Sequence, residues 1–571
     1  MHAANIRASS AATTERSSHE LQDLADEQRL KSLSQTQSSV TGHEYAEKLA
    51  ALTRFHKPFF DSQHLRALIK FLKTPTTCST AGLSDHTVLK QCNPFVYHYD
   101  VSLSQIGKPT TFDSPKDFLS FRQTSPPERE IVFLSGRPSS AWLNCLGGSL
   151  NVPAEFWTRH LDFLTVEERE DYVLQGAHTI TPQIISFDIP SLVFSGPSGR
   201  FLNQAELYEA QRSATRIVQG NLADVRKSCL SNVGNPMVRA LHVHKGHLLS
   251  VEQRITLTLL HRADSDVTGR PQWTILAYSD SSSLAPDLRH VLGGIQNFDS
   301  TCALKFCPIS FPSCWAKKDT VNHTNPKPRA NDDEPALAHL ASEYGSSITL
   351  NEHGVDAFDM LEELFHIAIC GIAQLLTALE QIIEDQLRRF SLPEKDVLEY
   401  ATSLSFYHHR GLLERHIVQL NKLLKCLRTR GGRHWDAPAL IHNHDDQWAD
   451  MLEQVLGLSE QAQGLLKKCD HGEELVRAKH ASDDMLRSAG RAKAMERLTE
   501  VTTFVTIFWL PLSFLSSIFG MNFRELNSGT LSIWVWAACS LPCAFVSILA
   551  LTFMHFRSRK RKPLNTKDKL S

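Results

Sequence analysis

The stretch that decides the fold is VTTFVTIFWLPLSFLSSIFG-MNFRELNSGT-LSIWVWAACSLPCAFVSILALTF, residues 501–553. Two uncharged apolar runs, Val501–Phe519 and Leu531–Phe553, flank a turn at residues 520–530. As a helix rising 1.5 Å per residue, the first run is about 29 Å long, which matches a ~30 Å hydrocarbon core. The second run is longer and can cross with some tilt. Because lipid offers the backbone no hydrogen-bond partners, the pattern predicts two transmembrane helices, 501–519 and 531–553.

The charges that flank these spans predict their orientation. The basic residues are Arg487, Arg491, Lys493 and Arg497 before the first span and Arg557, Arg559, Lys560, Arg561 and Lys562 after the second. The positive-inside rule then places both termini in the cytoplasm and residues 520–530 outside, as an outer loop. The basic cytoplasmic tail, 554–571, suits anionic lipid headgroups, so the lipid bilayer is an expected partner.

Composition narrows the class of protein. The chain has 571 residues, is 42% hydrophobic and carries a net charge of −2, so charge gives no argument for a nucleic-acid partner. Its twelve cysteines show no disulfide framework, which suits a reducing compartment. No phosphate-binding loop or nucleophile motif is found, so we expect neither an enzyme nor an organic cofactor. A plasma membrane is favoured over the mitochondrial inner membrane, because five acidic residues near the start argue against a transit peptide.

Before the spans, the sequence predicts a tail, an α/β domain and a helical stalk. Residues 1–45 are rich in Ser, Thr, Gln and Ala and are expected to be disordered. Residues 46–335 are expected to form a cytoplasmic α/β domain with a surface loop at 317–334. Its predicted strands are 131–134, 184–194, 253–260 and 273–278, and its predicted helices are 153–163 and 204–219.

The stalk is expected to cover residues 356–500. Helical periodicity runs over 356–390 and 394–427, and again from 446 directly into the first span. The apolar run Leu364–Leu376 is too short for a third span and contains His366, so it predicts a buried helix. The fold class is therefore an α+β membrane protein: a cytoplasmic α/β domain, a long helical stalk and two C-terminal transmembrane helices.

The first span carries a polar stripe. Hydroxyl residues recur at helical spacing along one face, and a leucine fills the gap: Thr499, Thr502, Thr506, Leu510, Ser513 and Ser517. Such hydroxyls either line water or bond to their own helix or a neighbouring one. Pro511 also leaves the Ile507 carbonyl without its helical donor, so that carbonyl needs another partner.

The turn Gly520-Met521-Asn522 favours the water-lining interpretation. Glycine allows a helix to end tightly, and Asn522 then offers a neutral amide oxygen at the outer mouth. Mg²⁺ loses its water slowly, so a selective mouth can hold the hydrated ion through hydrogen bonds to its water shell. One turn cannot enclose an ion, so several subunits must surround an axis.

The segment 497–523 resembles the pore helix and signature loop of the CorA family of magnesium channels. The shared features are the basic-Leu-Thr start at Arg497, the Pro-Leu-Ser-Phe centre at Pro511 and the Gly-Met-Asn-Phe end at Gly520. Residues 131–134, 142–143 and 156–164 are similar to the early strand and helix of fungal members. The resemblance implies a homopentamer in which the first span lines the pore.

The resemblance also implies roles for particular residues. Asn522 would form the selectivity ring, and Gly520 and Met521 would shape it. Thr506 and Ser513 would lie on the pore wall, whereas Thr499, Thr502 and Leu510 would match constriction positions. Two departures stand out: threonines occupy 499 and 502, where the family often has hydrophobic gate residues, and the outer-mouth acid Glu525 comes early, beside Arg524.

Other polar clusters in the sequence are compatible with either a binding site or an ordinary structural role. Asp483-Asp484 is similar to acidic pairs that sense Mg²⁺ between subunits in this family, and a solvated helix face is the alternative. His242, His244, His247 and His408-His409 are expected on helix or strand surfaces. His442–Asp446 is expected to be a polar helix start rather than a zinc or magnesium site.

The predicted function is a magnesium channel, with Mg²⁺ as the transported ion and a candidate regulator. A transporter of zinc or another divalent cation is the alternative within the same class. A non-conducting, membrane-tethered scaffold or sensor of the same fold is the alternative from another class.

Overall fold

The structure is a computed structural model of the chain. It describes residues 42–55, 63–74, 94–101, 106–124, 128–164, 183–195, 204–227, 233–245, 248–261, 272–280, 304–308, 336–345, 348, 356–391, 399–431, 435, 445–520 and 532–560. The chain divides into two compact units, Met1–Glu473 and Glu474–Ser571. The expected loop at 317–334 and most of the expected disordered tail lie outside the described residues.

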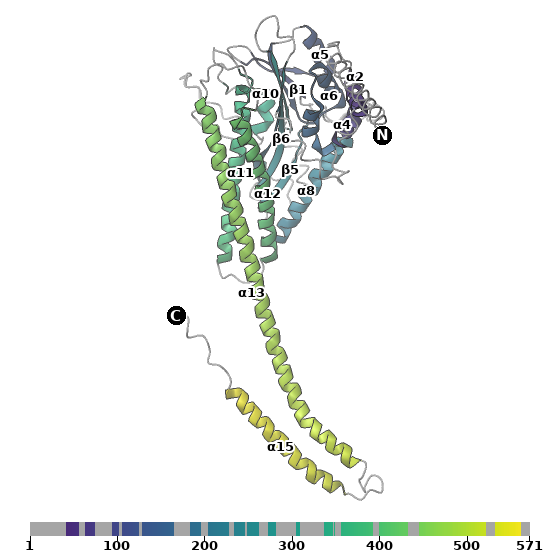
Figure 1. Cartoon of the computed structure of the whole chain (residues 1–571), viewed down its shortest axis with the longest axis vertical. Coiled ribbons are helices and arrows are strands. Elements are labelled where there is room, and N and C mark those ends of the chain that lie inside the picture. The colour runs from purple at the N-terminus through teal and green to yellow at the C-terminus, as the bar shows by residue number, and fades with distance from the viewer. Residues whose placement is uncertain are drawn as a thin grey trace, which may run out of the picture. The chain divides into compact units, whose positions relative to one another are not determined.

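The centre of the first unit is a mixed sheet of eight strands (Figure 1). Their bounds are β1 Val96–Asp100, β2 Thr110–Phe112, β3 Arg129–Ser135, β4 Ile184–Ser195, β5 Ala240–Lys245, β6 Leu248–His261, β7 Trp273–Ser279 and β8 Leu304–Phe306. The order is β2-β1-β3-β7-β6-β4-β8, and β5 pairs with β6. Only the β3–β7 pair is parallel; the other pairs of described strands are antiparallel.

Short helices of the first half of the chain pack on the sheet. They are α2 Gly42–Phe55, α4 Gln63–Leu72, α5 Pro115–Thr124, α6 Ser140–Ser149 and α7 Ala154–His160. Alternation along β3 directs Val132 and Leu134 into the core that these helices share. Within that core, the Tyr45 hydroxyl donates to the Val152 carbonyl at 2.7 Å and accepts from Trp157 Nε1 at 3.1 Å.

A second, smaller core lies under α8 (Gln204–Lys227). It takes Leu241 and Val243 from β5, Leu249 and Val251 from β6, and Ala214 from α8. Because side chains alternate along a strand, His242 and His244 of β5 point to the opposite face. That face is covered by α12 (Glu399–Arg428), whose histidines lie beside both of them.

The long helix α11 (Glu362–Ser391) packs on β4 and follows the short helix η5 (Asp359–Leu361). Phe187 of β4 stacks on Phe365 with ring centroids 5.9 Å apart. At Gly371 the helix approaches so closely that an added Cβ would lie 2.6 Å from the Pro190 carbonyl oxygen. An 18-residue apolar window of Asp359–Arg388 is 61% buried, which confirms a buried helix around Leu364–Leu376.

A segment far along the sequence, residues 336–345, is hydrogen-bonded to strand β1. It contains η4 (Ala336–His339) and α10 (Leu340–Glu343). The Tyr99 hydroxyl on β1 donates to the Ala341 carbonyl at 2.8 Å and accepts from the Tyr344 amide at 3.2 Å. The Tyr344 hydroxyl in turn donates to the Met360 carbonyl, just before α11.

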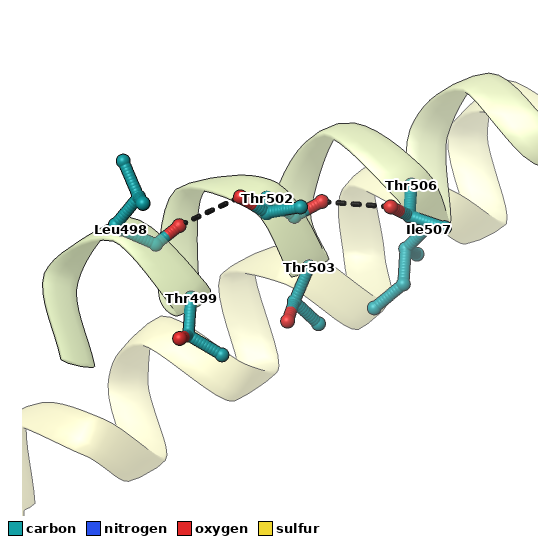
Figure 2. Close-up of a pocket in the computed structure, with 6 residues that line it drawn as sticks. All are labelled: Leu498, Thr499, Thr502, Thr503, Thr506 and Ile507. Atoms are coloured by element: carbon teal, nitrogen blue, oxygen red, sulfur yellow. Dashed lines mark hydrogen bonds between the residues drawn. The ribbon is translucent and has the colours of Figure 1, made fainter. Parts of the chain in front are cut away.

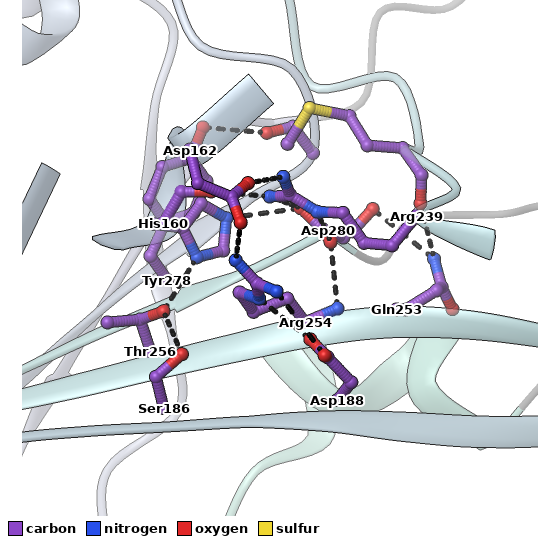
Figure 3. Close-up of polar contacts among 12 residues, drawn as sticks. His160, Asp162, Ser186, Asp188, Arg239, Gln253, Arg254, Thr256, Tyr278 and Asp280 are labelled. Carbon is purple, nitrogen blue, oxygen red and sulfur yellow. Dashed lines mark hydrogen bonds and ion pairs between the residues drawn. The ribbon is translucent and has the colours of Figure 1, made fainter. Parts of the chain in front are cut away.

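A buried ionic network joins the end of α7 to strands β4 and β6 and to the residues next to β5 and β7 (Figure 3). Arg239 makes two bonds to Asp280, at 2.5 and 2.8 Å, and Arg254 contacts Asp188 at 2.7 Å. His160 Nε2 lies 3.1 Å from Asp280. Burial would raise the pKa of Asp280, but Arg239 and His160 outweigh burial and hold it well below its usual range. Asp280 is fully buried and fully engaged, so the network is structural rather than reactive.

Two further helices, α13 and α15, complete the part of the chain that the structure describes. α13 runs continuously over Asp445–Gly520, 76 residues or about 114 Å, beginning in the first unit and ending in the second. α15 covers Ile533–Lys560. The apolar part of α13 is long enough to cross a membrane and has no buried share, and α15 carries a shorter apolar stretch, Trp534–Val546. The α+β class with a long helix and two apolar helices near the C-terminus is thereby confirmed.

Candidate functional site

The polar stripe lies on the exposed surface of α13, and Figure 2 shows its first three residues, Thr499, Thr502 and Thr506. Each threonine hydroxyl donates to a carbonyl one turn earlier: Thr499 to Met495 at 2.9 Å, Thr502 to Leu498 at 2.9 Å and Thr506 to Thr502 at 2.8 Å. The Ser513 hydroxyl donates to the Leu510 carbonyl at 3.1 Å. Within a single chain, these hydroxyls therefore bond to their own helix. This is one of the two alternatives that the sequence left open, the other being that they line water.

This bonding fixes what the stripe can offer to a ligand. A hydroxyl has one hydrogen to donate and two lone pairs. Since that hydrogen is used inside the helix, the outward side of each oxygen can only accept. Water molecules bound to a cation present their hydrogens outward. In this conformation the hydroxyls present a row of acceptors, which suits the hydrogens of a cation's water shell.

The same part of α13 borders a hollow of about 320 Å³. It is lined by Leu498, Thr499, Thr502, Thr503, Thr506 and Ile507. Thr503 belongs to this lining but not to the predicted stripe, because it lies about 100° around the helix from Thr502. The adjacent Thr502 and Thr503 in the sequence are the pattern from which this wider polar surface could have been predicted.

The remaining stripe residues are also exposed. Leu510 is 62% exposed, but so are Trp509 and Phe514 of other faces, at 63% each. One chain therefore leaves several faces of this helix uncovered, and the pore-facing role of Leu510, Ser513 and Ser517 stays a prediction. Pro511 lies inside the helix, as the sequence indicates.

The predicted selectivity loop begins where α13 ends. Gly520 is the last residue of α13. Met521, Asn522 and Glu525 lie outside the described residues. Their proposed roles at the outer mouth therefore stay predictions from the sequence.

The candidate regulatory pair lies on the exposed middle of α13. Asp483 is half-buried and Asp484 is exposed, with Arg487 Nη1 4.0 Å from Asp484. Successive residues point about 100° apart on a helix, so one chain cannot close both carboxylates around an ion. Across the described ranges, no group of three or more His, Cys, Asp or Glu residues is arranged to hold a metal.

The histidine prediction was wrong. His244 and His409 are 1% and 0% exposed, so they lie inside the first unit rather than on its surface. The prediction failed because β5 and α12 are far apart in the sequence, and each histidine taken alone looks like a residue of a solvated face. His247 lies outside the described residues.

Comparison with known proteins gives one family match, over the C-terminal part of the chain. Residues 332–557 match the family model described as "CorA-like Mg2+ transporter protein". Among solved structures, the chain is similar to the CorA magnesium transporter from Methanocaldococcus jannaschii, at 10% identity and a TM-score of 0.26, over 80% of this chain and 97% of that one. A search of curated proteins finds no significant match.

Proposed function

We propose that this chain forms a channel for Mg²⁺, driven by the membrane potential, because residues 332–557 match the model of the CorA-like Mg²⁺ transporter family. The family is one of transporters, in agreement with the expectation that the chain is not an enzyme. A potential of 100 mV supplies about 2.3 kcal/mol per elementary charge, or about 4.6 kcal/mol for a divalent ion moving inward.

The observation that carries this proposal is the row of acceptor oxygens on α13. Thr499, Thr502 and Thr506 all donate inward to their own helix, which leaves lone pairs along one exposed surface. A hydrated divalent cation needs such acceptors for the hydrogens of its water shell, and it avoids the cost of losing that shell. Neutral acceptors also bind weakly enough to release the ion.

The channel needs several copies of this helix. A single α13 leaves the stripe exposed, so the pore requires an assembly in which the stripes converge, and we propose a homopentamer from the family resemblance. In that assembly Gly520, Met521 and Asn522 form the selectivity loop, with Glu525 supplying outer-mouth charge. Asp483 and Asp484 are proposed to bind regulatory Mg²⁺ between subunits.

The membrane placement is proposed on the same basis. Both termini face the cytoplasm and the loop 520–530 faces outward, because the basic residues lie before the first span and after the second. A plasma membrane is favoured over the mitochondrial inner membrane.

The decisive experiment is magnesium uptake into cells that lack their own transport. We expect Asn522→Ala to lower uptake at least tenfold, because its carboxamide is the proposed contact to the hydrated ion. Asn527→Ala is the matched control, since it is the same substitution five residues later in the same loop. It should leave uptake unchanged.

Two outcomes would overturn the assignment. Equal uptake by wild type and Asn522→Ala would remove the proposed selectivity ring. No uptake by either, with the protein present in the membrane, would favour a non-conducting scaffold or sensor. Zn²⁺ uptake, measured in parallel, separates the magnesium proposal from the other divalent cations.

A further inference from the structure

Four imidazole rings meet between β5 and α12 inside the first unit, and a fifth histidine, His416, contacts Glu252, as His242 does. His242 and His244 come from the strand, and His408, His409 and His416 from the helix. The ring centroids of His242 and His408 are 5.4 Å apart, and those of His244 and His409 are 5.8 Å apart and stacked. His408 and His409 are themselves 5.7 Å apart. We call these five residues the histidine cluster.

Several of the ring nitrogens in the cluster are buried without a hydrogen-bond partner. Within the described residues, these are His244 Nδ1, His408 Nε2 and both nitrogens of His409 and of His416, although His416 Nε2 lies 3.4 Å from the Glu252 carboxylate. The His244 Nε2 atom is 2.8 Å from the Ser250 hydroxyl. A buried polar group without a partner is costly, and a charge on it costs far more. His244, His408 and His409 therefore fit their sites only while their rings are neutral.

The charged groups around the cluster are already engaged with one another. Glu252 of β6 lies 3.2 Å from His242 Nε2, 3.4 Å from His416 Nε2 and 3.6 Å from Arg415. Lys245 of β5 pairs with Asp385 of α11 at 3.1 Å. Gln211 of α8 uses its amide on the Val243 carbonyl at 2.8 Å. A second or third proton in the cluster would thus meet two cations, Arg415 and Lys245, and carboxylates that already have partners.

The titration behaviour agrees with this geometry. Burial and the neighbouring imidazoles lower the pKa of His244 well below its usual range. Burial and the nearby His409, His242 and Arg415 lower the pKa of His408 to about 2. Burial, with His242 and Lys245, lowers the pKa of His409 to about 4. For Glu252, burial and hydrogen bonding act in opposite directions. Burial would raise its pKa, but hydrogen bonds from His242 and His416 hold its pKa well below the usual range.

The same turn of α12 also contacts α13. Arg410 Nη1 lies 3.3 Å from Asp470 and 3.9 Å from Glu473, and Gly472 leaves room for the Phe406 ring. Residues 406–416 of α12 therefore connect the sheet, through the histidines, to the part of α13 that belongs to the first unit.

We propose that the histidine cluster is a pH-sensitive latch, which holds α12 on β5 at neutral pH and releases it as the pH falls. Opening exposes His244, His408 and His409 to water, where each ring can bind a proton that its buried site disfavours. The inference concerns the first unit and does not depend on ion conduction.

The direction of the pH effect follows from linkage. The pKa values of His244, His408 and His409 in the closed state lie below the ordinary 6.5. The closed state is therefore fully favoured above about pH 6.5 and loses stability as the pH falls from 6.5 toward 4. As the pH falls below about 6.5, each of the three histidines that stays neutral in the closed state raises the equilibrium constant for opening. The increase is up to about tenfold per pH unit for each histidine.

Hydrogen exchange of the full-length protein in detergent tests this latch. Exchange is measured with EDTA present at pH 7.5, 6.5, 5.5 and 5.0, and is normalised to the intrinsic chemical rate at each pH. We expect protection of residues 240–245 and 405–416 to fall more than tenfold between pH 6.5 and 5.5. Residues 129–135 of β3, away from the cluster, serve as the internal reference and should change less.

Two variants identify the groups responsible. His408→Leu combined with His409→Leu removes two titrating rings and should make the pH dependence at least tenfold shallower over the same interval. His471→Gln changes an exposed histidine of α13 and should behave as wild type. Unchanged wild-type protection from pH 7.5 to 5.0, or an equally steep dependence in the double variant, overturns the proposal. If the double variant does not fold, the wild-type dependence decides alone.

Discussion

At the scale of single residues, the important property of the threonine hydroxyls of α13 is that each donates its hydrogen to its own helix. Thr506 donates to the Thr502 carbonyl at 2.8 Å, and Thr502 donates to the Leu498 carbonyl at 2.9 Å. Both bonds are local, so they form in any assembly that keeps the helix. The polar character of this face is therefore a property of the single chain, and assembly only has to bring copies of it together.

Replacing Thr506 tests whether that oxygen contacts the transported ion. Thr506→Val keeps the branched shape but removes the acceptor, so we expect magnesium uptake to fall about tenfold, as expected for one lost hydrogen bond of ~1.4 kcal/mol. Thr506→Ser keeps the hydroxyl and should retain uptake within about twofold. Equal uptake by both variants would place this face away from the ion path.

The stripe could be predicted from the sequence because helical periodicity is local. Thr499, Thr502 and Thr506 fall on one face for any helix that includes them. The histidine cluster could not be predicted in this way. Arg415 and His242, which contact each other at its edge, are separated by 173 residues, and no local pattern brings them together.

At the scale of elements, the packing of α11 on β4 depends on one glycine. An added Cβ at Gly371 would lie 2.6 Å from the Pro190 carbonyl and 3.2 Å from Ile189 Cγ2. Backbone atoms cannot rotate away, so the helix must move. Gly411 on α12 is exposed, and an added Cβ there would meet nothing within 4 Å.

We expect opposite effects of alanine at these two positions. Gly371→Ala should destabilise the first unit by about 1–3 kcal/mol, through overpacking. Gly411→Ala should stabilise it by up to about 1 kcal/mol, because alanine loses less backbone entropy in a helix. Thermal unfolding of the detergent-solubilised protein, followed by tryptophan fluorescence, measures both. A Gly371→Ala variant as stable as wild type would contradict this close contact.

The long elements were predictable and the short ones were not. The predicted strands at 131–134, 184–194, 253–260 and 273–278 are confirmed as β3, β4, β6 and β7, and the long helix predicted from 446 is α13. β2 and β8 have three residues each, too few to show a period. β1 and β5 interleave histidines with apolar residues, and these histidines are buried by partners from elsewhere in the chain.

At the scale of the whole molecule, the distribution of charge predicts the topology. Both termini should lie on one side of the membrane and residues 520–530 on the other. An epitope tag at either end should then be protected in sealed, right-side-out vesicles, whereas a tag inserted after Ser528 should be accessible. Opposite accessibility of the two end tags would mean that the chain crosses an odd number of times.

The bond between Tyr99 and the Tyr344 amide joins residues 245 positions apart, and it has a consequence for synthesis. At about 5–20 residues per second, a ribosome needs about 12–50 s to travel from one to the other. During that interval β1 lacks its hydrogen bonds to residues 341 and 344 and is accessible to chaperones and proteases. Position 344 nevertheless precedes the first apolar span, so the nascent chain can close its sheet before the translocon receives a hydrophobic segment.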